Sequence, residues 1–271
     1  MLNFVFWNID ERPIESLLAQ LVHEHSIDVL CLAENASDPS KILAEIKSTT
    51  GSDFVYPDSD TPKIDIFCRS PKLGLNETYA DASGRLTIRK IHFDNSEFLL
   101  VATHLLDNQS ATAEDRASFA KTMADQIRTE EARRKNSRTI LCGDLNMNPF
   151  EPAIVHAQGL HAMPTKAIVS KKQRTIRKRN YPFFYNPMWG FLGDRHKEPP
   201  GTHYYRSGFV SYDWQLYDQV MFRADTLPWF NGNVEILTKI NGATLAKASG
   251  RPNRKIGSDH FPVFFQLQSR K

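Results

Sequence analysis

The sequence is poor in cysteine. Only Cys31, Cys68 and Cys142 occur among 271 residues, and each lies inside a short apolar run that is typical of a buried strand. An odd number of cysteines in such places indicates buried thiols in a reducing compartment rather than a disulfide framework. No apolar run approaches the roughly 20 residues of a membrane-spanning helix, and the first residues, MLNFVFWNIDERP, lack the basic start of a signal peptide. We therefore expect a cytoplasmic protein without membrane insertion.

Neither sign of charge dominates the chain. The formal net charge is +3 and the pI is about 8.7, values that are compatible with a polyanionic partner without requiring one. Hydrophobic residues make up 41% and charged residues 24% of the chain, as in ordinary globular proteins. Because repeats, low-complexity segments and separating linkers are absent, we expect one domain over residues 1–271, with a basic and aromatic insertion at about 166–200. The lack of charged tails favours a monomer.

The hydrophobic pattern alternates between strands and helices. Residues 2–9, 27–33 and 137–145 are typical of buried strands, and apolar spacing predicts a helix after Pro13. A longer helix is predicted from about Thr112 to Arg134, since Thr112 and Asp115 have the spacing of a capping box. Two β-rich halves with helices between their strands predict an α/β (α+β) fold. The expected architecture is a four-layer α/β/β/α sandwich of two mixed β-sheets packed face to face.

Polar residues recur where the apolar runs end. They are Asn8, Asp10, Glu34, His104, Asp144, Asn146, Asp218, Asp259 and His260. Any one of them is typical of a strand meeting water, but the set supplies carboxylates, amides and imidazoles repeatedly and almost no lysine or arginine. If these ends converge, the carboxylates repel one another unless a cation lies between them. Hard oxygen ligands and few cysteines favour Mg²⁺ or Mn²⁺ over zinc.

In this order, the motifs WNID, LAEN, ATHL, GDLNMNP, YDQV and GSDHFP resemble the endonuclease/exonuclease/phosphatase (deoxyribonuclease I-like) superfamily. The resemblance extends from residue 4 to residue 267, and GDLN followed by SDH is its specific part. Members include apurinic endonucleases, sphingomyelinases, inositol polyphosphate phosphatases, deadenylases and tyrosyl-DNA phosphodiesterases. The resemblance implies the sandwich fold and water attack at a phosphate bound to magnesium.

The same resemblance implies which residues bind the metal. Glu34 is similar to the family's main metal ligand, and Asp10 and Asp259 are similar to further carboxylates of the metal site. Asn8 and Asn146 resemble the amides that hold the attacking water or the phosphate oxygens.

It also implies which residues act on the phosphate. His260 resembles the imidazole that contacts the scissile phosphate, and Asp218 resembles the carboxylate that sets its tautomer. Asp144 resembles the carboxylate that positions or deprotonates the attacking water. His104 stands where nucleases and sphingomyelinases carry a histidine and apurinic endonucleases a tyrosine, which argues against a dedicated abasic-site enzyme.

A basic and aromatic segment is the main candidate for substrate binding. Residues 166–179 hold seven basic residues and no acid, and the aromatic run NYPFFYNPMWGF follows. Charge beside stacking faces is how single-stranded nucleic acid is held, although an inositol phosphate or an anionic lipid head group offers the same charge. The predicted substrate-binding residues are Arg85, Lys171, Lys172, Arg174, Tyr185, Trp189, Tyr204 and Arg254.

Three functions agree with these observations. The leading one is a divalent-metal-dependent phosphodiesterase, a nuclease that hydrolyses phosphodiester bonds in DNA or RNA. The second is a phosphatase or phospholipase C-like hydrolase of a small phosphorylated molecule or a lipid head group. The third is a non-catalytic binding module, which gives no physical reason to keep so many charged residues together.

Overall fold

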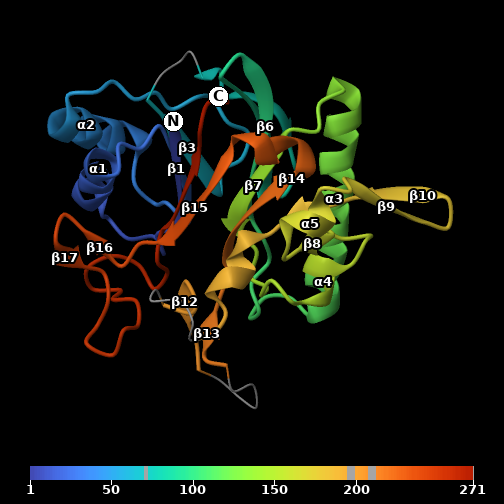
Figure 1. The fold of residues 1–271 in the computed structure, drawn as a ribbon. Helices are drawn as coiled ribbons and strands as arrows, with labels where there is room; N and C mark the ends of the chain where they lie inside the picture. The colour runs from blue at the N-terminus through green and yellow to red at the C-terminus, as the bar shows by residue number, and fades with distance from the viewer. Residues whose placement is uncertain (70–72, 194–198, 207–211, 271) are drawn as a thin grey trace.

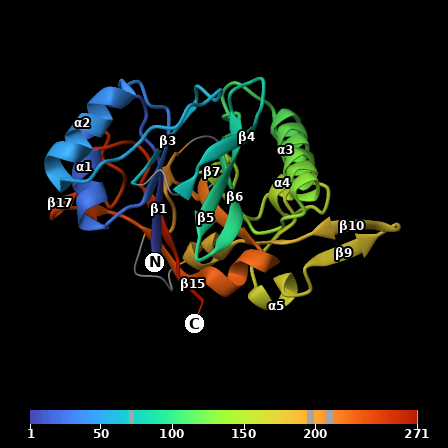
Figure 2. The ribbon, with the colours of Figure 1, turned by 90° about the horizontal axis from the view of Figure 1, so that it is seen from above.

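A computed structural model describes residues 1–69, 73–193, 199–206 and 212–270, and Figures 1 and 2 show its arrangement. One mixed sheet contains, in spatial order, β15 (Phe230–Ile236), β18 (Val263–Leu267), β1 (Leu2–Asn8), β2 (Val29–Ala33) and β3 (Ile64–Cys68). The other contains β4 (Asn76–Ala80), β5 (Leu86–Phe93), β6 (Ser96–His104), β7 (Thr139–Asp144), β14 (Asp218–Arg223), β11 (Phe184–Tyr185) and β8 (Ala162–Met163).

The helices cover the outer faces of the two sheets (Figures 1 and 2). Helices α1 (Glu15–Glu24) and α2 (Pro39–Thr50) lie against the five-stranded sheet, and α3 (Ala113–Arg134) and α4 (Pro152–Val155) against the seven-stranded one. This arrangement confirms the predicted four-layer α/β/β/α sandwich. The capping box of Thr112 and Asp115 begins α3 as the sequence predicts. Among the described helices, none is both long and apolar enough to cross a bilayer.

The smaller elements lie at the edges of the sandwich. They are α5 (Lys166–Val169), β9 (Gln173–Ile176), β10 (Arg179–Pro182), β12 (His203–Tyr204), β13 (Trp214–Gln215), β16 (Lys239–Ile240), β17 (Ala243–Thr244) and the 3₁₀ helices η2 (Pro187–Phe191) and η3 (Ala224–Trp229). Within the predicted insertion at 166–200, β9 and β10 form a hairpin. Residues 194–198 of that insertion lie outside the described residues.

Strand alternation divides the apolar side chains of the seven-stranded sheet between its two faces. Leu100 and Ala102 of β6 and Cys142 of β7 belong to the core that the two sheets share. Val101 and Leu141, one residue away along each strand, pack with α3 instead. Because side chains alternate with a period of two, the residues that continue the inner rows are His104 and Asp144. The shared core therefore leads directly to polar side chains at one edge of the sandwich.

A buried ion pair fixes the opposite end of the same strands. The Arg223 guanidinium, at the end of β14, lies 2.8 Å from Glu131 of α3, and both side chains are buried. The Thr139 hydroxyl, at the start of β7, donates a hydrogen bond to the same carboxylate at 2.6 Å. Glu131 thus joins α3 to β7 and β14 at the end that lies away from Asp144 and Asp218.

We expect Arg223→Met to lower the free energy of unfolding by about 3–5 kcal/mol, because it leaves the Glu131 carboxylate buried without its partner. The matched control is Lys47→Met, which breaks the exposed Lys47–Asp53 pair and is expected to cost at most about 1 kcal/mol. Urea unfolding measures both. Equal losses in the two variants would contradict the anchoring role of Glu131.

Candidate active site

Strand register places three polar side chains next to one another on the seven-stranded sheet. His104 pairs with Asp144 across the parallel β6–β7 ladder, and Asp144 pairs with Asp218 across the antiparallel β7–β14 ladder. Neighbouring strands lie about 4.8 Å apart, so residues paired in this way present their side chains side by side. All three are buried. The sequence therefore brings together an imidazole and two carboxylates by pairing alone.

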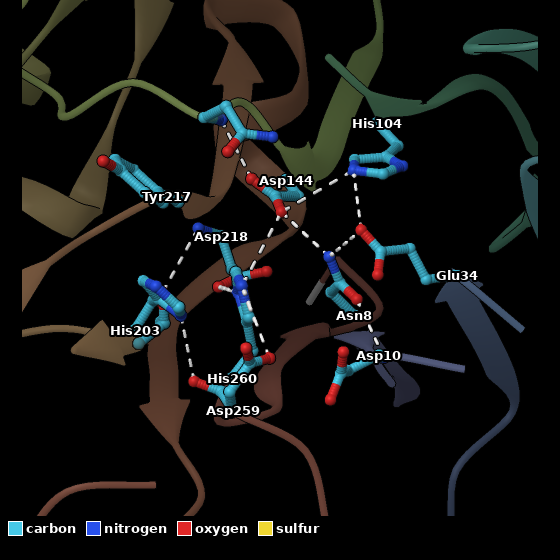
Figure 3. Close-up of polar contacts among 12 residues, drawn as sticks. Asn8, Asp10, Glu34, His104, Asp144, His203, Tyr217, Asp218, Asp259 and His260 are labelled. Carbon is cyan, nitrogen blue, oxygen red and sulfur yellow. Dashed lines mark hydrogen bonds and ion pairs between the residues drawn. The ribbon is translucent and has the colours of Figure 1, made fainter. Parts of the chain in front are cut away.

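The five-stranded sheet supplies the other side of the site (Figure 3). Asn8 ends β1, and Glu34 comes directly after Ala33, the residue that pairs with Asn8 in β2. The Asn8 side-chain amide donates to Glu34 Oε1 at 3.2 Å and to Asp144 Oδ2 at 3.0 Å. His104 Nε2 lies 3.3 Å from the same Glu34 oxygen. One amide and one imidazole thus connect carboxylates from different sheets.

His260 is held from three directions just before β18. Its Nδ1 lies 2.7 Å from Asp218 Oδ2, and its Nε2 lies 4.0 Å from Asp144 Oδ2. The Trp7 indole N–H donates to the His260 carbonyl at 2.9 Å. The Ser258 hydroxyl donates to the Asn8 carbonyl at 2.7 Å and accepts from the His260 N–H at 3.1 Å. The imidazole is therefore fixed in position, with Asp218 on one nitrogen and the cleft on the other.

The backbone is in the left-handed region at three residues of the site. The φ angles are 52° at Asp10, 50° at Glu34 and 48° at Asn146. Residues other than glycine rarely adopt this conformation, and where they do it often marks a functional site. The Glu34 carbonyl accepts from the Glu11 N–H at 2.8 Å, so hydrogen bonds beyond the strand ends hold this conformation.

The buried charges shift one another's pKa values. Burial lowers the pKa of His260, but the negative charges of Asp218 and Asp144 outweigh burial and raise the pKa to about 10. Burial raises the pKa of Asp144, yet the positive charges of His260 and His104 outweigh burial and hold the pKa below its ordinary value. His260 is therefore an imidazolium at neutral pH, and Asp144 is a carboxylate.

The remaining predicted metal and amide residues differ in their contacts. Asp10 forms an ion pair with Arg254, whose Nη2 lies 2.6 Å from Asp10 Oδ1. Burial and the nearby Asp259 carboxylate raise the pKa of Asp10, and Arg254 opposes them. Asp259 lies beside His260, with 4.0 Å between its Oδ1 and His260 Nε2. The Asn146 amide donates to the Leu105 carbonyl at 3.2 Å. Asp10, predicted to bind the metal, and Arg254, predicted to bind the substrate, are thus paired with each other.

The structure does not bring the basic segment to this site. Lys171, Lys172 and Arg174 lie on or beside the β9–β10 hairpin, which projects past α3 on the outer side of the seven-stranded sheet (Figures 1 and 2). Lys172 is ion-paired with Asp225 at 2.8 Å. Tyr185 pairs with Phe222, four residues along β14 from Asp218, which corresponds to about 13 Å. These four residues are therefore not part of the site that we propose.

The other predicted substrate residues are engaged in local contacts. Arg85 Nη1 donates to the carbonyls of His104 and Leu105 at 3.3 Å, so it supports the backbone beneath the site. The Tyr204 hydroxyl donates to Asp213 at 2.7 Å. Trp189 packs edge-on against Phe150, with 6.5 Å between the ring centroids.

Three aromatic residues of the site, His203, Tyr205 and Tyr217, were not among the predicted ones. The His203 ring lies 4.3 Å from the His260 ring between centroids, and its Nδ1 donates to the Asp259 carbonyl at 3.0 Å. Burial and the positive charge of His260 lower the pKa of His203 to about 4. Tyr217 stacks on His203 at 5.7 Å. The signal in the sequence was the pair of motifs GTHYY and YDQV, of which only Tyr204 and Asp218 were selected.

A cleft of about 300 Å³ lies at this site, and the residues described above that line it are Asn8, Glu34, Asp144, Asn146, His203, Tyr217 and His260. Its described lining includes Glu34, Asp107 and Asp144 but neither lysine nor arginine, so the cleft is acidic. An acidic, oxygen-rich lining fits a hard divalent cation, since an anionic phosphate would otherwise be repelled. Two groups of donor atoms lie within 4.8 Å of one another, His203–Asp259–His260 and Asp144–Asp218–His260. Glu34 belongs to neither, but its carboxylate faces the same cleft.

Comparison with known proteins agrees with the fold of the chain. The Endonuclease/Exonuclease/phosphatase family matches residues 5–260, and no curated protein matches the chain. D. rerio TDP2 complexed with single strand DNA product is 16% identical, with a TM-score of 0.58 over 99% of each chain. A protein of this family from Leptotrichia buccalis is 13% identical, with a TM-score of 0.60 over 99% of this chain and 100% of that one. An AP endonuclease from Archaeoglobus fulgidus is 14% identical, with a TM-score of 0.57 over 98% of this chain and 99% of that one. At these identities the three structures show a shared fold.

Asp218 is expected to make the stability of the metal-free protein depend on pH above neutrality. The pKa of His260 is raised to about 10 in the folded protein, against about 6.5 when unfolded. The contribution of the imidazolium is thus complete below pH 6.5 and is lost as the pH rises through about 10. Asp218→Asn should flatten this decline, as measured by urea unfolding in EDTA between pH 6 and 10. The control His156→Gln should follow wild type, and an unchanged decline in Asp218→Asn would show that Asp218 does not hold the proton on His260.

Proposed function

Because the chain belongs to the endonuclease/exonuclease/phosphatase family, we propose that it is a divalent-metal-dependent nuclease that hydrolyses phosphodiester bonds in DNA. Members of this family are hydrolases that act on phosphodiester bonds, and they generally use divalent metals. The observation that carries the proposal is the convergence of Glu34, Asp144 and His260 on one cleft from three separate segments of the chain.

His260 supplies positive charge at the place where the phosphate gains negative charge. Its Nδ1–H donates to Asp218, which leaves Nε2–H directed at the cleft in the imidazolium form. A donor that is fixed before the reaction stabilises the developing charge without reorganisation. Asp218 acts through His260 by setting its tautomer and orientation.

Asp144 is the residue that we assign to the attacking water. It is buried, and the neighbouring imidazoles keep it ionised at neutral pH. Its Oδ2 lies 3.9 Å from His104 Nε2 and 4.0 Å from His260 Nε2, so its negative charge is balanced on two sides. A carboxylate in this position orients a water molecule and accepts its proton.

Glu34 is the residue that we expect to hold the cation, together with a carboxylate oxygen of Asp144. Magnesium or manganese fits this pair because carboxylate oxygens are among their preferred ligands. When bound, the cation neutralises charge on the phosphate. Asp10 and Asp259 remain candidates for the same site. Asp10 takes part only if its ion pair with Arg254 opens.

A second candidate function is hydrolysis of a small phosphate ester. The described lining of the cleft lacks lysine and arginine, and the basic hairpin lies on another side of the sandwich. A long polyanion therefore finds no basic residue among the described residues that line the cleft. This observation favours a substrate that places few phosphates near the site, such as a short single strand or a small ester.

Glu34→Gln, Asp144→Asn and His260→Ala are each expected to lower kcat for cleavage of single-stranded DNA in Mg²⁺ by at least about 10²–10³-fold. EDTA should abolish the activity of the wild-type protein. Cleavage of a 5′-labelled oligonucleotide measures all of these changes, and circular dichroism checks that the variants are folded.

The matched control is Glu45→Gln, which changes a glutamate of α2 on the outer layer and should retain wild-type activity. Undiminished, metal-dependent cleavage by folded His260→Ala would overturn the assignment of that residue. Cleavage of p-nitrophenyl phosphate esters without cleavage of DNA or RNA would favour the second candidate.

A further inference from the structure

One wall of the cleft is a stack of aromatic rings. The rings of Tyr205 and His203 are 6.4 Å apart between centroids and inclined by 23°, and those of His203 and Tyr217 are 5.7 Å apart and inclined by 18°. Tyr217 is buried at the inner end, beside the catalytic groups, whereas Tyr205 is 49% exposed at the outer end. The wall therefore presents a free aromatic face where the cleft meets solvent.

Local hydrogen bonds hold this wall in place. His203 pairs with Gln215 in the β12–β13 hairpin, and the Tyr205 N–H donates to the Asp213 carbonyl at 2.9 Å. The Asn108 side-chain amide donates to the Tyr217 hydroxyl at 2.8 Å. The backbone that carries the outer ring is thus held by a hydrogen bond to the strand-side segment at Asp213.

Another wall of the cleft is polar. Asp107, Asn108 and Gln109 come from the loop between β6 and α3 and line the same cleft. The Asp107 carboxylate accepts from the Gln109 and Ser110 N–H groups at 2.8 and 2.7 Å, which fixes the loop. Amide side chains can donate to and accept from the edge of a nucleobase, while an aromatic ring can stack on its face. The two walls together offer both contacts.

On this basis we propose that the cleft binds one unpaired nucleobase next to the scissile phosphate, stacked on Tyr205 and facing Asn108 and Gln109. This inference rests on the proposed nuclease function. The base is unpaired because a base within a duplex exposes neither its face nor its pairing edge. The volume of about 300 Å³ is at the lower end for ligand pockets, which favours one nucleotide over a base pair.

The lack of cations in the cleft points in the same direction. Within the described residues, no lysine or arginine lines it, and Arg254 is ion-paired with Asp10. Within the cleft itself, affinity for a nucleotide then comes from stacking and edge contacts beside the metal site. Because both contacts need an unpaired base, single-stranded substrates are preferred over duplex ones of the same sequence.

The test compares Tyr205→Ala, Tyr205→Phe and Tyr212→Ala. Tyr212 is the matched control because it is 50% exposed, precedes β13 and lies outside the lining of the cleft. The substrates are the single-stranded oligomer d(TTTTT) and versions in which a tetrahydrofuran residue replaces one base at each position in turn. Values of kcat/KM are measured in Mg²⁺.

We expect Tyr205→Ala to lower kcat/KM for d(TTTTT) by about 10- to 100-fold, whereas Tyr205→Phe and Tyr212→Ala stay near wild type. Removing one particular base should lower wild-type kcat/KM to a similar degree, and Tyr205→Ala should then add little. Wild-type activity of Tyr205→Ala on d(TTTTT), or an equal loss on every base-free substrate, would overturn the proposal.

A binding measurement separates this proposal from the proposed nuclease function. The fluorescence of 2-aminopurine, placed at each position of the same oligomer, is followed in Ca²⁺ for wild type and the three variants. Binding that depends on Tyr205 without any cleavage in Mg²⁺ would support the nucleobase site and contradict the nuclease. Cleavage and binding that do not depend on Tyr205 would support the nuclease and contradict the nucleobase site. The absence of both cleavage and binding would contradict both proposals.

Discussion

The carboxylates of two different sheets lie in one partly buried cleft, and their mutual repulsion is the constraint on which this site depends. Glu34 directly follows β2 of the five-stranded sheet, and Asp144 and Asp218 belong to the seven-stranded one. The Asn8 amide and the imidazoles of His104 and His260 lie between them. Each donor offsets part of the negative charge, and a divalent cation at Glu34 would complete the compensation.

One end of the sandwich contains a buried ion pair that stabilises the fold, and the other end contains the candidate site. At one end, the Glu131–Arg223 pair and the Thr139 hydroxyl connect α3 to β7 and β14. At the other end the same strands present Asp144 and Asp218 to the cleft. Because the apolar rows between the two ends are continuous, Asp144 and Asp218 project from packed strands. Other lining residues, such as Glu34, Asn146 and His260, lie in the segments just before or after strands.

The predicted fold was confirmed because it depends on patterns that are local in the sequence. Alternating apolar residues identify strands, and the Thr112–Asp115 capping box identifies the start of α3. The candidate site could also be predicted from the sequence, because polar residues at the ends of several apolar runs are expected to meet at one edge of the fold. The structure brings together Asn8, Glu34, His104, Asp144, Asp218 and His260. The roles of these residues stay predictions.

The placement of the basic segment could not be predicted from the sequence in this way. Seven basic residues in 166–179 show that the segment is charged, but composition does not say on which side of a sheet it will lie. The pairing of Tyr185 with Phe222 decides that, and it is a contact between residues far apart in the sequence. His203 was missed for the same reason, because a β-bridge between His203 and His260 joins residues that are far apart in the sequence. The ion pair of Asp10 with Arg254 likewise joins the two ends of the chain.

The most direct test of the central claim is the anomalous diffraction of manganese in crystals of this protein. The account predicts one strong anomalous peak within bonding distance of the Glu34 carboxylate in the wild type, and loss of that peak in Glu34→Gln. A peak at the His203–Asp259–His260 group alone, or no peak in the cleft, would show that the carboxylates of the two sheets do not share a cation.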